Sequence, residues 1–366
     1  MLLRRPLFVT LSAAMLVLLV ARTGATAASS GAHGKDPLAA EIAKWSAYVR
    51  NNASKDDLWG QIKPGSEAML TRADDALRDG RRLVALQRLA AARVNLAAYS
   101  YLNGLPSLER NDAPAFEREW TRLAKTYGGG TAPAEALAGI QPAAVRAVAE
   151  AALPQAREYF DASRDYAHNT EPRFGFLYLG TAKAQTEFVE FCRSLSEPPA
   201  GRRPAIRGIH SELDALEAEI LAAYRPPASI DRHSEFIGVS AAVKEARELD
   251  AAGLRYGALM RYLQAELRFA ELRPSLQKWE PGALRRQLDE LEARLSAGGV
   301  DHTIGCVFLE SARGDLAVPP ATGPGTAGAI ASEVLPRYFA ALEPAAPEKP
   351  KPVPGVTVTL VRWPYT

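Results

Sequence analysis

One block of sequence occurs twice in this chain, and its repetition restricts the fold more than any other feature. Residues of the first copy meet identical residues 173 positions later: Ala73, Gly80, Arg82, Ala85, Leu86, Arg88 and Ala92 match Ala246, Gly253, Arg255, Ala258, Leu259, Arg261 and Ala265. Apolar residues recur at intervals of three and four in both copies, which is the spacing of one helix face. The sequence therefore predicts two related helical halves.

Two further pairs of segments follow in the same order. Pro106–Leu108 matches Pro274–Leu276, and Ala147–Pro154 (AVAEAALP) matches Ala329–Pro336 (AIASEVLP). The apolar positions after the first of these pairs also align: Phe116, Trp120 and Leu123 fall opposite Leu284, Leu288 and Leu291. Three matches in one order favour duplication of a helical unit over chance similarity.

The first block also resembles a known pattern. Gly80, Ala85, Leu86, Leu89 and Ala92 are similar to the second-helix pattern of tetratricopeptide-repeat proteins, and the second copy repeats it. Glycine permits a tight turn between two helices, and small residues let them approach closely. The resemblance is confined to one short segment in each half, and no regular tandem array follows. It implies stacked antiparallel helix hairpins.

Periodicity and breaks at proline and glycine divide the chain into expected helices. These are 37–52, 66–79, 81–103, 112–127, 141–168, 173–195, 205–224, 238–251, 254–273, 280–296, 303–313 and 326–343. The predicted fold class is all-α, with two related halves at 37–195 and 205–343. Residues 196–204 (SEPPAGRRP) form the predicted linker, because their prolines cannot continue a helix.

The first 27 residues have the pattern of a secretory signal peptide. Arg4 and Arg5 precede an apolar run from Pro6 to Ala21, and Ala25-Thr26-Ala27 supplies small residues for cleavage. The alternative is an uncleaved membrane anchor. Residues 28–36 read as a flexible leader, and no later segment is long and apolar enough to span a membrane. We therefore expect an exported protein, periplasmic or extracellular.

The last segment differs from the rest of the chain. Residues 344–355 form a proline-rich connector, and Val356–Trp363 (VTVTLVRW) reads as a lone extended strand. Its backbone groups need partners. The strand either pairs with a partner or a second copy, or it lies across the helices.

The charge balance argues against nucleic-acid binding. Residues 1–27 contain three arginines and no acid, and the remainder has 41 basic and 42 acidic side chains. Affinity for nucleic acid comes largely from neutralising phosphates, which a near-neutral protein does poorly.

Motifs for catalysis and for cofactors are absent from the sequence. It contains no G-x-S-x-G, no phosphate-binding G-x-x-x-x-G-K-[ST], no H-E-x-x-H and no C-x-x-C-H. We therefore predict no metal and no cofactor. Asp165, His168 and Glu171 are the candidates for acid–base chemistry, because their spacing places some of them on one helix face. A solvated helix end explains the same residues.

Six residues are candidates for ligand binding. Arg82, Arg88, Arg255 and Arg261 occupy equivalent places in both halves, where they either line an anionic groove or form ion pairs with nearby acids. Phe174 and Tyr178 belong to an apolar stripe, which packs in the core or borders an apolar slot between helices.

The only cysteines are Cys192 and Cys306. Outside the cytosol they either form a disulfide or remain buried thiols.

The leading functional hypothesis is an exported helical-repeat scaffold that binds a protein partner. The alternatives are a binder of a small apolar or anionic ligand at the junction of the halves, and a helical enzyme of a type that the motifs do not reveal.

Overall fold

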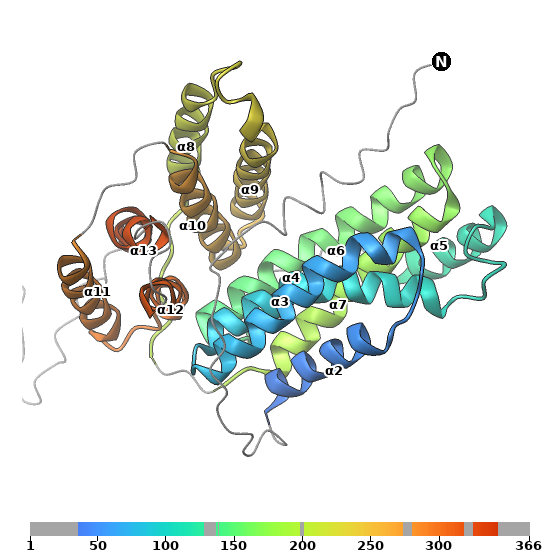
Figure 1. Ribbon diagram of the computed structural model, residues 1–366, viewed down its shortest axis with the longest axis horizontal. Helices are drawn as coiled ribbons and strands as arrows, with labels where there is room; N and C mark the ends of the chain where they lie inside the picture. The colour runs from blue at the N-terminus through green and yellow to red at the C-terminus, as the bar shows by residue number, and fades with distance from the viewer. Residues whose placement is uncertain are drawn as a thin grey trace, which may run out of the picture.

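The structure is a computed structural model that describes residues 36–127, 137, 139–197, 201–273, 280–317 and 325–342. Within these residues all regular secondary structure is helical, which confirms the all-α prediction (Figure 1). The expected signal peptide and the C-terminal connector and strand lie outside the described residues. None of the described helices combines the length and the apolar character that crossing a bilayer requires.

The helices of the first half form one elongated bundle (Figure 1). They are α2 (Pro37–Asn51), α3 (Asp57–Arg78), α4 (Arg82–Gly104), α5 (Ala113–Tyr127), α6 (Ala143–Asn169) and α7 (Pro172–Ser194). The second half consists of α8 (His210–Ala223), the short 3-10 helix η2 (Ile230–Arg232), α9 (His233–Ala251), α10 (Arg255–Leu272), α11 (Pro281–Ser296), α12 (Thr303–Ala317), α13 (Gly325–Ala329), the π-helical turn η3 (Ile330–Val334) and α14 (Leu335–Ala341).

The duplicated block forms the same helix hairpin in both halves. Gly80 joins α3 to α4 with a φ of 78°, and Gly253 joins α9 to α10 with a φ of 75°. The amide after each glycine donates to a carbonyl five residues back, from Arg81 to Ala76 and from Leu254 to Leu249. Left-handed backbone of this kind favours glycine, which explains why both copies carry it.

The buried face of the hairpin repeats as well. Each of the following residues of α3 is buried, and so is the residue 173 positions later in α9: Ser66, Met69, Leu70, Ala73 and Ala76 correspond to Val239, Ala242, Val243, Ala246 and Leu249. Ala73 and Ala246 are the one identical pair among these five. The two halves therefore keep the pattern of burial more closely than the residue types.

The third matched block does not join equivalent helices. Ala147–Pro154 lies in α6, whereas Ala329–Pro336 runs through η3 into α14. In the first half α5 packs on α6, and in the second half α11 packs on α12, so α12 takes the place of α6. The pair α13–α14 correspondingly takes the place of α7. The match of these two segments therefore does not mark equivalent positions in the two halves.

Some helix boundaries differ from those predicted, because tertiary packing decides them. Helix α3 begins at Asp57 instead of residue 66 and continues through Pro64. Trp59 in its first turn is buried and stacks on Tyr99 with ring centroids 4.9 Å apart, which holds the turns before the proline. Helix α8 begins at His210 instead of residue 205, because Ile206 forms an isolated backbone bridge with Leu342.

The two halves interlock. Helix α6 packs against α10 of the second half, and α12 packs against α4 of the first half. The segment predicted as a linker takes part: the Arg202 amide donates to the Gly299 carbonyl at 2.7 Å, and the Asp301 amide donates to the Arg202 carbonyl at 2.8 Å. Asp36, the last residue of the expected leader, caps α2 by accepting from the Leu38 amide. Side chains on both sides of the junction therefore enclose a shared interior.

Candidate functional site

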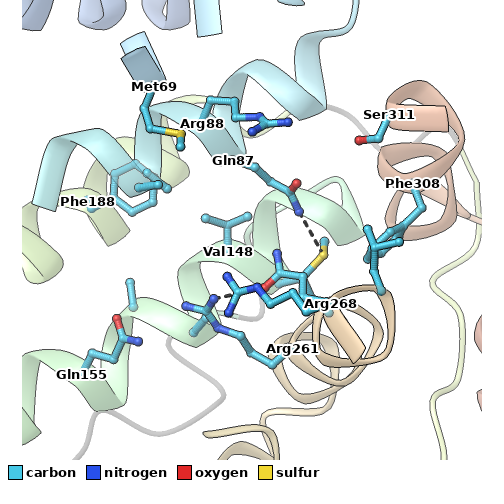
Figure 2. Close-up of a pocket in the computed structure, with 18 of the residues that line it drawn as sticks. Met69, Gln87, Arg88, Val148, Gln155, Phe188, Arg261, Arg268, Phe308 and Ser311 are labelled. Atoms are coloured by element: carbon cyan, nitrogen blue, oxygen red, sulfur yellow. Dashed lines mark hydrogen bonds between the residues drawn. The ribbon is translucent and has the colours of Figure 1, made fainter. Parts of the chain in front are cut away.

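A cavity of about 170 Å³ lies at the junction of the two halves, and we call it the junction cavity (Figure 2). Helices α3, α4, α6 and α7 of the first half and α10 and α12 of the second half contribute side chains to it. The cavity lies where α6 packs on α10 and α12 packs on α4.

Small and apolar side chains form the walls of the junction cavity. They include Ala147, Val148, Ala151, Ala152, Phe188 and Met260. The alanines come from one face of α6, which also packs closely on α10: a Cβ added to Gly257 of α10 would lie 2.9 Å from Glu150 Cβ. Short side chains thus bring the helices together and leave space beside the contact.

Polar side chains border the same cavity. They include Gln87, Arg88, Arg261, Gln264, Arg268 and Glu271, which are half-buried. Gln87 Nε2 donates to Met260 Sδ at 3.2 Å, and these two residues occupy equivalent positions in the duplicated block. Figure 2 shows Arg88 extending from α4 on one side of this contact, with Arg261 and Arg268 on the other. Equivalent residues of the two halves therefore meet at the cavity.

Arg88 and Arg261 are equivalent by sequence, yet their surroundings differ. Arg261 Nε lies 3.2 Å from Glu245 Oε2 and Arg261 Nη1 donates to Gln264 Oε1. In the first half the residue equivalent to Glu245 is Arg72, a second cation. Among the described residues, Arg88 forms no hydrogen bond and no ion pair.

The electrostatics of Arg88 reflect this arrangement. Burial lowers the pKa of its guanidinium to about 10, with the like charges of Arg72 and Arg81 acting in the same direction. Asp315 is the acid that acts against this. Arg88 stays protonated at neutral pH, so it carries a partly desolvated positive charge into the cavity.

On the opposite wall Arg268 adds another half-buried cation. Burial lowers the pKa of Arg268, and the like charge of Arg261 contributes. Figure 2 shows the guanidinium groups of Arg261 and Arg268 near one another. The opposite wall therefore carries positive charge as well, part of which Glu245 balances at Arg261.

Two of the six predicted binding residues line the junction cavity, Arg88 and Arg261. Arg82 instead pairs with Asp36, with Nη2 2.9 Å from Oδ1, and Arg255 pairs with Asp250. Both therefore have the alternative role that the sequence allowed, that of ion-pair partners near the start of α4 and α10.

Phe174 and Tyr178 lie away from the junction cavity. Phe174 is half-buried beneath the Arg173 guanidinium, which lies 4.8 Å from its ring centroid. Tyr178 is buried and stacks on Tyr166 with centroids 4.2 Å apart. Tyr178 therefore packs in the interior of the first half, whereas Phe174 lies partly exposed beside an arginine.

Asp165, His168 and Glu171 lie on the exposed surface at the end of α6. His168 Nε2 is 2.7 Å from Glu117 Oε1 of α5, and Glu171 pairs with Arg173 at 3.0 Å. They line no described cavity, so the geometry favours solvated ion pairs over acid–base catalysis.

The thiols of Cys192 and Cys306 are both free. Burial raises the pKa of Cys192 to about 12 and that of Cys306 to about 11, so neither is a nucleophile at neutral pH. Within the described residues no group of three or more histidine, cysteine, aspartate or glutamate side chains is arranged to hold a metal ion.

The sequence did not identify the residues that make the surroundings of Arg88 differ from those of Arg261. Arg72 was available as a signal, because it stands opposite Glu245 in the duplicated block. Arg268 and Gln87 gave no such signal, because their roles depend on how the halves meet.

Comparison of the chain with protein-family models, with curated proteins and with solved structures finds no match.

Proposed function

We propose that this protein is exported and binds a small molecule in the junction cavity, one with a single anionic group on an apolar body. The signal-like segment at residues 1–27 supports export. The apolar walls and the arginine-rich edge of the cavity support the class of ligand. N-terminal sequencing of the secreted protein is expected to start at Ala28, and a retained segment 1–27 contradicts cleavage.

The observation that carries the proposal is the state of Arg88. A half-buried guanidinium with no ion-pair partner among the described residues is costly, because its charge is partly removed from water. The equivalent arginine of the other half has its carboxylate within the protein. A ligand carboxylate would form with Arg88 the ion pair that Glu245 forms with Arg261.

The size of the cavity limits the apolar body. An apolar cavity of roughly 150 Å³ accepts a molecule the size of benzene. The junction cavity is of similar volume, so phenylacetate is a suitable probe: its ring would contact Val148 and Phe188, and its carboxylate would reach the arginines. Phenylacetamide has the same shape without the charge and is the matched control.

Isothermal titration calorimetry tests the proposal. We expect phenylacetate to bind and phenylacetamide to bind at least about tenfold more weakly, because only the anion pairs with arginine. Arg88→Gln is expected to weaken phenylacetate binding to a similar degree. Equal affinity for the acid and the amide contradicts the anion site, and no binding of either contradicts the proposal as a whole.

Arg72→Glu is the sharper variant, because it rebuilds in the first half the ion pair of the second. The introduced carboxylate would offer Arg88 an internal partner, so phenylacetate binding should fall while the free energy of unfolding rises by about 1 kcal/mol. Opposite changes in affinity and stability separate this result from damage to the fold. An unchanged affinity shows that Arg88 is not the residue that holds the anion.

A protein partner is the second candidate function, as an exported helical scaffold. The exposed apolar side chains at the free end of the α8–α9 hairpin favour it: Leu221 is 69% exposed and Ile230 is 52% exposed (Figure 1). Affinity purification from the native host is expected to recover a partner that Leu221→Ser together with Ile230→Ser releases. Deletion of residues 344–366 tests the tail separately. A partner retained by both variants binds elsewhere.

A further inference from the structure

Two carboxyl groups lie near the arginines of the junction cavity, and one of them lines it. Glu271 of α10 lines the cavity one helical turn beyond Arg268, and the charge of Asp315 of α12 interacts with the charges of Arg88 and Arg81. Arg81 lies against α12 next to Asp315: a Cβ added to the neighbouring Gly314 would lie 2.5 Å from Arg81 Nη1. Each acid therefore interacts with one of the arginines that line the cavity, Glu271 with Arg268 and Asp315 with Arg88.

The two carboxyl groups are incompletely satisfied. Asp315 Oδ2 is buried and has no hydrogen-bond partner among the described residues. Thr326 Oγ1 lies 3.3 Å from Glu271 Oε1, which is a long contact for a hydroxyl donor. The charge of Asp315 also acts on Glu271 as a like charge. A proton on either group relieves this repulsion.

We propose that the junction cavity takes up its anionic ligand together with a proton, which goes to the Glu271 and Asp315 carboxyl pair. This inference rests on the proposed function. When both acids are ionised, their negative charge opposes the attraction of the arginines for a carboxylate. When one acid is protonated, that opposing charge is removed. The ligand anion in turn favours the proton, because the two equilibria are linked.

The ionisation of these groups occurs in the range that this coupling requires. Burial raises the pKa of Glu271 to about 7 and that of Asp315 to about 6. The arginines nearby stay charged throughout the neutral range, and no histidine among the described residues belongs to the group. The charged side chains that face the pair or border the cavity are Arg72, Arg81, Arg88, Arg232, Arg261, Arg268, Glu245 and Glu310.

Glu310 is a third half-buried carboxyl group nearby, but it is not the group that takes up the proton. Burial raises its pKa too, yet its carboxylate accepts a hydrogen bond from the Val84 amide at the start of α4. It therefore has a donor of its own, and Glu310→Gln should leave the coupling in place.

Calorimetric titration with phenylacetate from pH 6 to pH 8 tests the inference, since the probe is ionised throughout this range. We expect the dissociation constant to rise about tenfold between pH 6 and pH 8, as one proton with a pKa near 7 requires. Repeating the titration in buffers of different ionisation enthalpy should show uptake of up to one proton per ligand near pH 7.

The double variant Glu271→Gln with Asp315→Asn should bind phenylacetate at pH 8 as tightly as the wild type does at pH 6, with no slope. Glu190→Gln changes an exposed acid of α7 and should keep the wild-type slope. Circular dichroism melting checks that each variant is folded, and the single variant Glu271→Gln replaces the double one if that fails to fold.

The outcomes separate the two proposals. Phenylacetate that binds with the same affinity at pH 6 and pH 8, or a double variant that keeps the slope, overturns proton coupling and leaves the anion site intact. Phenylacetate that does not bind at any pH overturns the proposed function itself.

Discussion

Glu150 and Glu310 each complete the first turn of a helix that belongs to the other half. Glu150 of α6 accepts from the Gly257 amide of α10 at 2.8 Å, and Glu310 of α12 accepts from the Val84 amide of α4 at 3.4 Å. Gly257 and Val84 are equivalent positions in the duplicated block. Neither α4 nor α10 has a capping side chain at its own N-cap, so the cap comes from across the junction.

The buried cap predicts a large loss of stability for Glu150→Ala. Glu150 is fully buried, and its other oxygen accepts from Arg146 Nε at 2.7 Å. Removal leaves an amide and a guanidinium without their acceptor, which should cost about 2–4 kcal/mol of unfolding free energy in urea titrations. Glu190→Ala removes an exposed ion pair and should cost less than about 0.5 kcal/mol. Similar losses for both variants would refute the cap.

The close approach of α6 and α10 predicts that Gly257→Ala is destabilising. The added methyl group would lie 2.9 Å from Glu150 Cβ and 3.2 Å from the Ala151 amide nitrogen, so the helices must move apart at a cost of about 1–3 kcal/mol. Gly60→Ala in α3 meets nothing within 4 Å and should stabilise by about 0.5–1 kcal/mol through helix propensity. Thermal melting of the two variants should show shifts of opposite sign.

The repeated turn predicts equal effects for Gly80→Ala and Gly253→Ala. Both glycines have positive φ and open space around the missing Cβ, so the cost is backbone strain alone, about 1–2 kcal/mol for each. Asparagine tolerates this conformation better, and Gly80→Asn and Gly253→Asn should recover part of the loss. A strong effect at one glycine and none at the other contradicts the equivalence of the two hairpins.

The raised pKa of the buried Glu266 predicts that the protein loses stability as the pH rises. Burial raises its pKa to about 7, although Arg337 lies 2.8 Å away and opposes the shift. The folded protein then holds the proton more tightly than the unfolded chain, so the free energy of unfolding falls between about pH 4.5 and pH 7. The whole change is at most about 3 kcal/mol.

Glu266→Gln should flatten this part of the stability curve, as urea titrations at pH 5 and pH 8 would measure. Glu271 and Asp315 contribute in the same direction, so the comparison is between the slopes of wild type and variant. An identical slope shows that Glu266 keeps an ordinary pKa.

Much of the fold could be predicted from the sequence, because helix periodicity and turn glycines act locally. The spacing of apolar residues placed most helices, and the pair Gly80 and Gly253 identified the repeated hairpin. Helix α2 packs on α3 as α8 packs on α9, but the sequence did not indicate this likeness. The buried faces of α2 and α8 share a spacing without sharing residue types: Ile42, Trp45 and Val49 against Leu213, Leu216 and Ile220.

The candidate site was predicted only in part. Arg88 and Arg261 were singled out by duplication, and both line the junction cavity. The other matched pair of the same block, Arg82 and Arg255, is held by acids nearby. Nothing in the sequence distinguished the two pairs, because the difference lies in which surface of α4 and α10 faces the other half.

The sequence by itself determined the helical class, the duplication and the tight glycine turns, since each depends on residues close together in the chain. Only the tertiary structure decided that α6 packs on α10 and α12 on α4, that a cavity remains where the halves meet, and that Arg88 faces it opposite Arg261 and Arg268. Those features arise from contacts between residues far apart in the chain. Burial at such contacts removes a charge from water, and this is what makes an unpaired charge costly in free energy.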